Sequence, residues 1–464
     1  MDKLAIQLYN SLSGKKEPLV TNKPGVVKMY SCGPTVYNFF HIGNARAFVT
    51  FDMVRRYLIY RGYQVKFVQN FTDVDDKLIN KANELNTTVE TVANRFIEEY
   101  FIDANTIGIE KADAHPRVTD TMEDIILFID RLVMTGYAYV AGGDVLFETP
   151  KFAEYGKLSK QSLDELLSGS RVEVSDYKRH PTDFTLWKAA KPGEPSWDSP
   201  WGKGRPGWHI ECSAMIQKHL GDHIDIHGGG HDLIFPHHEN EIAQSEALLG
   251  SPLAKYFMHN GYININNEKM SKSLGNSVNV RDLAQQYDPR ALRLFLISAH
   301  YRSPINFSDE VMQQMMAAIQ RIDASREHLM LRLQSSYLPE GDPFDLSMFE
   351  SRLLEAMDDD FNSAIATGVL FDLVREINLY MRSDDLTRQG LGSYLEKLDA
   401  WLELYGLLQL EKVEDKEKIE SLVKEREEAR KERNFAIADA IRVKLEEMGV
   451  HLEDAAQGTR WWRD

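Results

Sequence analysis

The chain has 464 residues, 43% of them hydrophobic and 27% charged, which is the composition of a soluble globular protein with roughly two to four domains. Its formal net charge of −17 argues against a passive coat on nucleic acid, because phosphate binding draws on lysine and arginine. The overall charge still leaves room for a local basic face.

The first residues of the chain carry no recognisable export signal. Residues 1–19 lack the basic start, the long apolar stretch and the small-residue cleavage site of a signal peptide. No apolar run approaches the roughly 18 residues needed to span a bilayer. We therefore expect a cytoplasmic protein without membrane contacts, whose two cysteines are reduced thiols.

Strand and helix patterns alternate after this N-terminal segment. The sequence predicts a strand over residues 26–32, a helix over 45–61 and a second strand over 63–71. Strand, helix and strand at this spacing indicate a βαβ unit and therefore a parallel sheet. Ligands of such sheets bind at the carboxyl ends of the strands, where Cys32 and the tetrapeptide HIGN (residues 41–44) fall.

Further helices and an insertion extend this domain. A short helix is expected after an N-cap at Thr72 or Asp73, followed by helices over residues 90–107 and 119–134. Residues 136–207 look like an insertion, in which a hairpin is followed by turn-rich polar sequence. After this insertion the α/β pattern resumes.

The C-terminal part of the chain is predicted to be mainly helical. Helical spacing continues from about residue 288 to residue 410. The charge-dense residues 411–433 indicate a solvated helix or linker, and residues 429–454 an amphipathic helix that runs into a short strand. We expect a helical bundle followed by a small C-terminal domain.

The tetrapeptide HIGN lies where a strand turns into a helix. Free N–H groups at a helix N-terminus suit phosphate, and Gly43 lets a flat group approach the backbone. His41 can donate to a phosphate oxygen as charge develops on it. An ordinary turn with a surface histidine is the alternative, because four residues make a weak motif.

A second candidate is the sequence KMSKS, residues 269–273, on an expected exposed loop. Its lysines, Lys269 and Lys272, are flanked by hydroxyl groups and suit a mobile clamp on a triphosphate. The alternative is a solvated polar loop. The chain contains no G-x-x-x-x-G-K-[ST] sequence, so a P-loop is not its nucleotide site.

The third candidate is a group of metal-ligand residue types. His237 and Glu241 are four residues apart and share one face once a helix begins, and Cys212 lies upstream of them. Thiolate, imidazole and carboxylate are all ligands of Zn²⁺, and Cys32 would make a set of four. The alternatives are that the cysteines are small buried hydrophobes, that one is a nucleophile, or that they form a disulfide, which the expected compartment disfavours.

Together these motifs resemble those of the class I aminoacyl-tRNA synthetases, and the finer resemblance is to the cysteinyl-tRNA synthetases over essentially the whole chain. The matching segments, in order, are MYSCGPTVYNFFHIGNAR, NFTDVDDKLI, GRPGWHIECSAM, HGGGHDLIFPHHENEIAQSEA, EKMSKSLGN and LEDAAQGTRW. The resemblance implies ATP-dependent ligation of L-cysteine to tRNA(Cys) in two steps through a cysteinyl-adenylate, with Mg²⁺ on the ATP.

The resemblance also implies one zinc ion per chain. In the family, two cysteines, a histidine and a glutamate hold the ion, and the matching positions are Cys32, Cys212, His237 and Glu241. Zinc bound to the substrate thiolate would discriminate against serine, because a hydroxyl is a poorer ligand. Four protein ligands normally mark a closed structural site, so the substrate must enter as a fifth ligand or displace one.

The same resemblance assigns residues to the two small substrates. Those expected around the cysteine are Gly33, Thr35, Thr72, Trp208 and His227. Those expected around ATP are His41, Gly43, Asn44, the glycine loop with Gly229 and Gly230, Asp232 and Lys272. The expected catalytic residues are His41, Asn44, Lys269 and Lys272. A core aromatic is the alternative for Trp208.

The C-terminal segment is expected to read the anticodon. Arg430, Asp439 and Asp454 match family positions that hydrogen-bond to anticodon bases, and Phe435 stands where some members have tryptophan. Bases of single-stranded loops are read by stacking and by contacts to their edges. Plain helix surface is the alternative for the acidic residues.

The expected architecture is α/β: a Rossmann-like parallel-sheet catalytic domain with an insertion, followed by a helical bundle and a small C-terminal anticodon-binding domain. The expected boundaries are 1–135 and 208–250 for the catalytic domain, 136–207 for the connective insertion, 251–310 for a stem-contact region with KMSKS, 311–410 for the bundle and 411–464 for the C-terminal domain. A monomer is the family default.

Two other proteins are alternatives to this reading. The cysteine ligase of mycothiol biosynthesis shares the catalytic fold, but it needs no anticodon-reading tail. A zinc-containing RNA-binding protein without catalysis would not need both HIGN and KMSKS.

Overall fold

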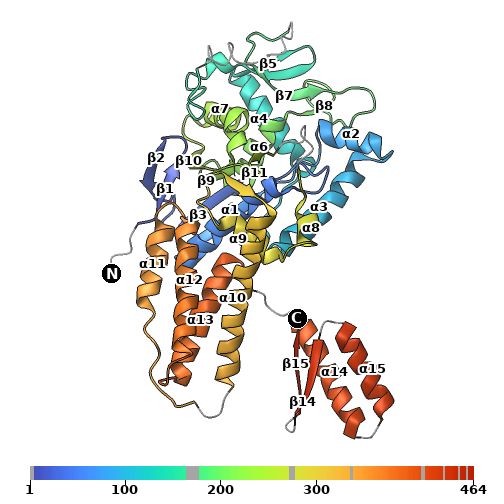
Figure 1. Ribbon diagram of the computed structural model, residues 1–464. Helices are drawn as coiled ribbons and strands as arrows, with labels where there is room; N and C mark the ends of the chain where they lie inside the picture. Colours follow the sequence, from blue (N-terminus) through green and yellow to red (C-terminus); the bar gives the residue numbers. More distant parts are fainter. Residues whose placement is uncertain are drawn as a thin grey trace. The chain divides into compact units, whose positions relative to one another are not determined.

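The computed structural model describes residues 5–162, 177–270, 277–334, 338–408, 413–431, 434–447, 450–455 and 458–463. Contacts divide the chain into two units, Met1–Leu407 and Leu408–Asp464, and each is described by itself (Figure 1). No helix within the described ranges is both long and apolar enough to cross a membrane.

A four-stranded parallel sheet lies at the centre of the larger unit, which confirms the fold that the βαβ pattern predicted. Its strands are β3 (Val26–Ser31), β4 (Gln64–Gln69), β9 (Ile224–Gly230) and β10 (Ala254–Asn260). They lie in the order β10-β9-β3-β4, with every neighbouring pair parallel. The backbone N–H of Cys32, just after β3, donates to Gly228 of β9 at 3.2 Å, so the carboxyl ends of both strands meet at one edge.

Helices cover this sheet and carry the site. They are α1 (Ile42–Tyr60), α2 (Asp76–Glu84), α3 (Val89–Thr106), α4 (Met122–Met134), α6 (Trp208–Leu220), α7 (Glu239–Leu249) and the short α8 (Val280–Ala284). Helix α1 begins at the carboxyl edge of the sheet and contacts β4, β9 and β10. Most of its apolar side chains, among them Phe48, Val49 and Phe51, are buried.

The N-cap of α2 is Asp75, and not Thr72 or Asp73 as the sequence suggested. The Asp75 carboxylate accepts from two backbone N–H groups of the first turn, at 2.6 and 3.2 Å. The other two side chains have partners far along the chain: Thr72 donates to Glu211, and Asp73 accepts from Thr119. These tertiary partners decide which residue caps the helix.

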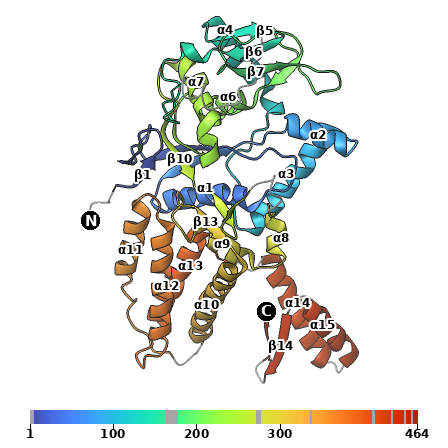
Figure 2. The same ribbon diagram turned by 45° about the horizontal axis from the view of Figure 1, so that its top comes forward.

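An antiparallel sheet stands between α4 and α6 in the sequence. Its strands, in spatial and chain order, are β5 (Ala138–Ala141), β6 (Asp144–Phe147), β7 (Phe184–Ala189) and β8 (Gly204–Pro206). Figure 2 shows β5, β6 and β7 at the top of the view, beside α4 and above α6. Val145, Phe147 and Trp187 are fully buried in a core shared with α4 and α6.

The remainder of the larger unit is a helical bundle with two small strand groups. The bundle elements are α9 (Pro289–Ile297), α10 (Asp309–Leu333), α11 (Ser347–Asp358), α12 (Ser363–Tyr380) and α13 (Arg388–Tyr405). The strand groups are the hairpin β1 (Gln7–Asn10) and β2 (Lys15–Pro18), and the sheet of β11 (Ile263–Ile265), β12 (Glu268–Lys269) and β13 (Ile305–Phe307). Strand β13 interrupts the predicted run of helix, because it pairs in parallel with β11.

The smaller unit contains two helices and a hairpin. They are α14 (Val413–Lys431), α15 (Phe435–Glu447), β14 (Val450–Ala455) and β15 (Gly458–Arg463). The expectation of a helix over 411–433 is confirmed, but this helix is not solvated on every side. Ile419, Leu422 and Val423 of α14 pack with Ile441 and Leu445 of α15 in the core of this unit.

Candidate active site and metal-ligand cluster

All four predicted metal-ligand residues meet at the carboxyl edge of the parallel sheet. One ligand atom from each of Cys32, Cys212, His237 and Glu241 lies within 4.8 Å of the others, and all four residues are buried. Cys32 follows β3, Cys212 is on α6, His237 lies in the turn before α7, and Glu241 is on α7. We call these four residues the metal-ligand cluster.

Contacts inside the cluster are short. The two sulfur atoms are 3.9 Å apart, so the cysteines are free thiols and not a disulfide. The Sγ atom of Cys212 lies 3.6 Å from Nε2 of His237. The same Nε2 lies 2.9 Å from Oε1 of Glu241, four residues further along the chain. All of these atoms are therefore close enough to share one ion.

The charges of the cluster favour a cation. Although burial raises it, the pKa of the Glu241 carboxyl is held well below its usual range by His227 and His237. The hydrogen bond from Cys32, opposed by burial, lowers the pKa of the Cys212 thiol to about 6. The cluster thus holds a buried carboxylate and a buried thiolate. Burial raises the pKa of the Cys32 thiol, and Glu241, against the effect of burial, raises the pKa of His237 to about 10, so both residues must lose a proton before all four can bind an ion.

A second set of ligand atoms overlaps the first. It consists of Cys32, His227, His238 and Glu241, again within 4.8 Å of one another. Nε2 of His238 lies 3.3 Å from the Cys32 sulfur, and Nε2 of His227 lies 2.7 Å from Oε2 of Glu241. His227 was expected around the substrate cysteine, and it lies fully buried against a cluster residue.

Three further histidines were not singled out from the sequence. Nδ1 of His209 lies 3.0 Å from Nδ1 of His237. His209 therefore contacts the ring nitrogen of His237 that does not face the other cluster residues. His259 contacts His238 in the same way, because its Nε2 lies 2.8 Å from Nδ1 of His238. The available signal was local, since His209 and His238 each neighbour a motif residue, whereas His259 comes from a separate strand.

The HIGN turn begins α1 at the same edge. His41 is the N-cap of the helix, and its Nδ1 accepts from the backbone N–H of Asn44 at 3.2 Å. This leaves the proton of a neutral imidazole on Nε2, where it can be donated. Burial lowers the pKa of His41, and Asp232 partly offsets the effect, so the ring is neutral at pH 7.

Described residues on either side of residues 271–276 lie beside HIGN. Met270 packs so closely on Gly43 that a Cβ there would lie 2.4 Å from the methionine Cε. Beyond the segment, Ile42 donates its backbone N–H to Val278 at 3.0 Å, and Val280 donates to Phe40 at 3.2 Å.

The two KMSKS lysines themselves are described only in part. Lys269 ends β12, and its side chain lies outside the described atoms. Lys272 lies outside the described residues altogether.

The predicted glycine loop is the end of a strand. Gly229 and Gly230 are the last residues of β9, and the exposed Asp232 follows in a short turn. A Cβ on Gly229 would lie 2.8 Å from Cε1 of His238, and a Cβ on Gly230 would lie 2.5 Å from Oδ1 of Asp232. Glycine is therefore required at Gly229, next to the buried His238 ring, whereas at Gly230 the exposed Asp232 side chain could move aside.

Two residues expected around the cysteine, Trp208 and His227, contact the cluster. Trp208 is 43% exposed, so it is not a core aromatic, and its ring stacks on His237 with centroids 4.3 Å apart. Thr35 and Thr72 form a parallel bridge. Gly33 follows Cys32, and a Cβ there would lie 1.7 Å from the backbone oxygen of Asn70. These residues line the same carboxyl edge.

The expected anticodon residues lie in the smaller unit. Arg430 is exposed on α14, and Phe435 and Asp439 are exposed on α15, with 60% of Phe435 accessible to solvent. Asp454 is on β14, and its side chain lies outside the described atoms.

Comparison with known proteins defines the class. A family model described as the tRNA synthetases class I (C) catalytic domain matches residues 18–317, and a DALR domain model matches residues 352–409. A methionyl-tRNA synthetase of Mycobacterium tuberculosis with methionyl-adenylate has a TM-score of 0.60 at 16% identity, over 82% of this chain and 89% of that one. A LeuRS of Agrobacterium radiobacter K84 has 0.60 at 13%, over 84% and 86%. The fold and the family model make the chain a class I aminoacyl-tRNA synthetase.

Curated relatives narrow this class to one family. A cysteine–tRNA ligase of Halalkalibacterium halodurans is 56% identical over 99% of this chain and 100% of the relative. One from Geobacillus sp. (strain WCH70) is 55% identical over 99% of both chains. The chain belongs to the cysteine–tRNA ligase family.

Proposed function

We propose that the chain ligates L-cysteine to tRNA(Cys) at the expense of ATP. Family membership supports this activity, and one observation of the site carries it. Two thiols, an imidazole and a carboxylate converge within 4.8 Å at the same sheet edge as the HIGN turn. A site for a thiol-containing side chain and a site for a nucleotide are therefore adjacent.

The ion that we propose for the metal-ligand cluster is Zn²⁺, held by Cys32, Cys212, His237 and Glu241. Sulfur, nitrogen and oxygen ligands of these types suit zinc. When bound, zinc supplies a soft Lewis acid that favours a substrate thiolate over a serine hydroxyl. His209 then acts as the outer partner that orients His237.

Cysteine selection is assigned to the residues around this cluster. Trp208 stacks over His237, and its own ring is partly exposed to solvent. Thr72 is held by a 2.8 Å hydrogen bond to Glu211, so its orientation is fixed before substrate arrives. Gly33, Thr35 and His227 complete the proposed cysteine pocket.

ATP is assigned to the HIGN edge, with Mg²⁺ bound to its phosphates. The Nε2–H of His41 and the backbone N–H of Gly43 are the proposed donors for phosphate oxygens, because the N–H groups of Ile42 and Asn44 already donate to Val278 and His41. The remaining proposed ATP residues are Gly43, Asn44, Gly229, Gly230, Asp232, Lys269 and Lys272. The cysteine carboxylate attacks the α-phosphate and pyrophosphate leaves. Fixed donors stabilise the developing charge without a side-chain base.

The second step transfers the cysteinyl group to a terminal ribose hydroxyl of the tRNA. Arg430, Phe435, Asp439 and Asp454 are proposed to contact anticodon bases, and a monomer acting in the cytoplasm is proposed. The smaller unit has a hydrophobic core of its own. Such a unit favours a tRNA ligase over the mycothiol-pathway ligase, which needs no anticodon reader.

Two assays test the proposal in sequence. Cysteine-dependent exchange of pyrophosphate into ATP reports the first step, and charging of a tRNA(Cys) transcript reports the second. We expect both, with about one zinc per chain by elemental analysis. Serine in place of cysteine is the matched control and should support little exchange. Lack of exchange would refute both enzyme readings, and exchange without tRNA charging would favour the mycothiol-type ligase.

A further inference from the structure

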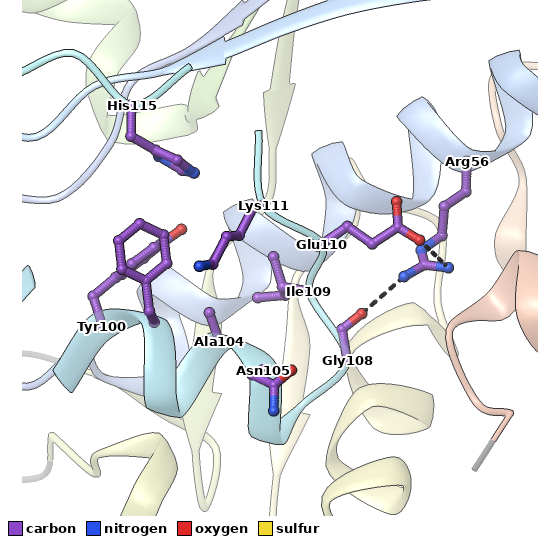
Figure 3. A pocket seen from close by; sticks show the side chains of 10 residues that line it. Arg56, Tyr100, Ala104, Asn105, Gly108, Ile109, Glu110, Lys111 and His115 are labelled. Atoms are coloured by element: carbon purple, nitrogen blue, oxygen red, sulfur yellow. Dashed lines mark hydrogen bonds and ion pairs between the residues drawn. The ribbon is translucent and has the colours of Figure 1, made fainter. Parts of the chain in front are cut away.

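A cavity of about 390 Å³ lies between the end of α3 and α1, and it shares no lining residue with the metal-ligand cluster (Figure 3). Its charged side chains already have protein partners. Arg56 pairs with Glu110 at 3.0 Å and donates to the Gly108 carbonyl at 3.1 Å, and Lys111 lies over the ring of Phe101. Another arginine of α1, Arg46, is buried and bonds only to backbone carbonyl oxygens among the contacts described.

Arg46 is fully buried, five residues after His41 on α1. Its guanidinium donates to backbone carbonyl oxygens of two regions. One is the last turn of α9, and the other is the stretch that follows it, which we call segment 298–303. The acceptors and distances are Leu296 at 3.0 Å, His300 at 3.2 Å, Tyr301 at 3.4 Å and Ser303 at 2.9 Å. Burial lowers the pKa of Arg46 to about 10, so the group stays charged at neutral pH.

Segment 298–303 contacts the residues just before β11, the strand that leads towards KMSKS. The Tyr301 carbonyl, which Arg46 contacts, also accepts from the backbone N–H of Gly261 at 2.8 Å. Ile305 then donates its N–H to Tyr262 at 3.0 Å. A Cβ on Gly261 would lie 2.6 Å from the Arg302 oxygen, so the two segments touch along their backbones. Strand β11 starts two residues after Gly261, and β12 ends on the first residue of KMSKS.

A second buried group holds segment 298–303 from the bundle side. Asp360, after α11, accepts from the Tyr301 hydroxyl and from Nε of Arg302, each at 2.8 Å. Segment 298–303 is therefore fixed between α1 and the bundle, and it fixes β11 in turn.

We propose that Arg46 is a positioning residue for adenylate formation: it sets the strand leading to KMSKS relative to the HIGN turn of its own helix. This inference rests on the proposed function. Lysine cannot replace it, because one ammonium group cannot satisfy four carbonyls spread over a turn. A misplacement of about 1 Å far from the reacting atoms can cost on the order of 10²-fold in rate.

Arg46→Lys tests the proposal in cysteine-dependent ATP–pyrophosphate exchange, normalised by active-site titration of adenylate. We expect kcat to fall by roughly 10–100-fold. The KM for cysteine should stay within about twofold, because Arg46 touches none of the proposed cysteine residues. In Arg46→Ala, guanidinium at sub-denaturing concentration should restore part of kcat, whereas urea at the same concentration should not.

Arg293→Lys is the matched control. Arg293 is also fully buried and donates to the backbone carbonyls of Tyr405, Ile107 and Gly108, none of which is in segment 298–303. Its variant should lose stability but keep kcat per active site within about twofold.

Two results would overturn the role of Arg46: an unchanged kcat in Arg46→Lys, or an equal loss in Arg293→Lys. A wild-type chain without cysteine-dependent exchange would instead refute the proposed function and this inference with it.

Discussion

At the scale of single residues, the cluster concentrates groups that are costly to bury one by one. Glu241 and Cys212 are both almost inaccessible to solvent. Burial alone would drive each toward its neutral form. His227 and His237 oppose this effect at Glu241, and the hydrogen bond from Cys32 opposes it at Cys212. The arrangement is stable as an anionic site because its partners are fixed by other elements.

Cys212→Ser should lower both metal content and cysteine affinity while leaving the KM for ATP nearly unchanged. A serine hydroxyl is harder to deprotonate than a thiol and binds a soft ion poorly. The loss of metal affinity should exceed the roughly 10–100-fold that removing an outer partner costs. Elemental analysis and substrate titration measure these effects.

Ser213→Ala is the control for this substitution, since Ser213 is the buried neighbour of Cys212 on α6. It should keep its metal. Full metal content in Cys212→Ser would remove Cys212 from the proposed ligand set.

At the scale of elements, the periodic patterns located most helices and strands, and long-range partners set their ends. Helix α1 starts at Ile42 and not at residue 45, because His41 caps it. Strand β13 was missed because three residues carry little pattern, and its pairing with β11 is a tertiary contact. The cap of α2 was misplaced for the same reason, since Thr72 bonds to Glu211 instead.

Asp75→Ala should destabilise the start of α2 by about 1 kcal/mol, the usual effect of removing an N-cap oxygen. The Asp75 carboxylate accepts from the two first-turn N–H groups that would lose their partner. Hydrogen exchange of the α2 amides should speed up accordingly. Asp75→Asn keeps an acceptor and should exchange much like the wild type. Equal acceleration in both variants would argue for charge, and not capping, as the cause.

At the scale of the whole molecule, buried ion pairs join the helices of the larger unit. Asp52 of α1 pairs with Arg293 of α9 and with Arg56, and it accepts from the Glu110 N–H at 3.0 Å. Burial raises the pKa of Asp52, but these partners, Arg293 first, hold it below its usual range. The stability that Asp52 contributes is therefore present above about pH 4 and is lost as pH falls through the lowered pKa.

Asp52→Asn should cost about 3–5 kcal/mol at pH 7, because it leaves the Arg293 charge buried without its carboxylate. The difference in unfolding free energy from the wild type should stay constant from pH 7 to about pH 5 and shrink below about pH 4. Urea denaturation at several pH values measures it. A difference that grows on acidification would contradict the assigned pKa direction.

A chain ending at Leu407 tests the role of the smaller unit. The two units divide at this point, and the smaller one has its own core. Pyrophosphate exchange should remain within about twofold, while tRNA charging should fall by on the order of 10²–10⁴-fold, because a linked second contact raises overall affinity by that order. Substitution of Phe435 by alanine in the full chain is the milder comparison. An intact charging rate after truncation would remove the anticodon assignment.

Sequence by itself determined the βαβ pattern, the two motifs and the residue types of a metal site, because these depend on local periodicity and on side-chain chemistry. Tertiary structure decided which of these residues meet. Cys32 and Cys212 are 180 residues apart along the chain, and the packing of α6 on the parallel sheet brings their sulfur atoms to 3.9 Å. His259 and Arg46 have no local signal of their roles, since their partners come from distant segments. A parallel sheet brings together residues far apart in the chain, so only folding sets these distances.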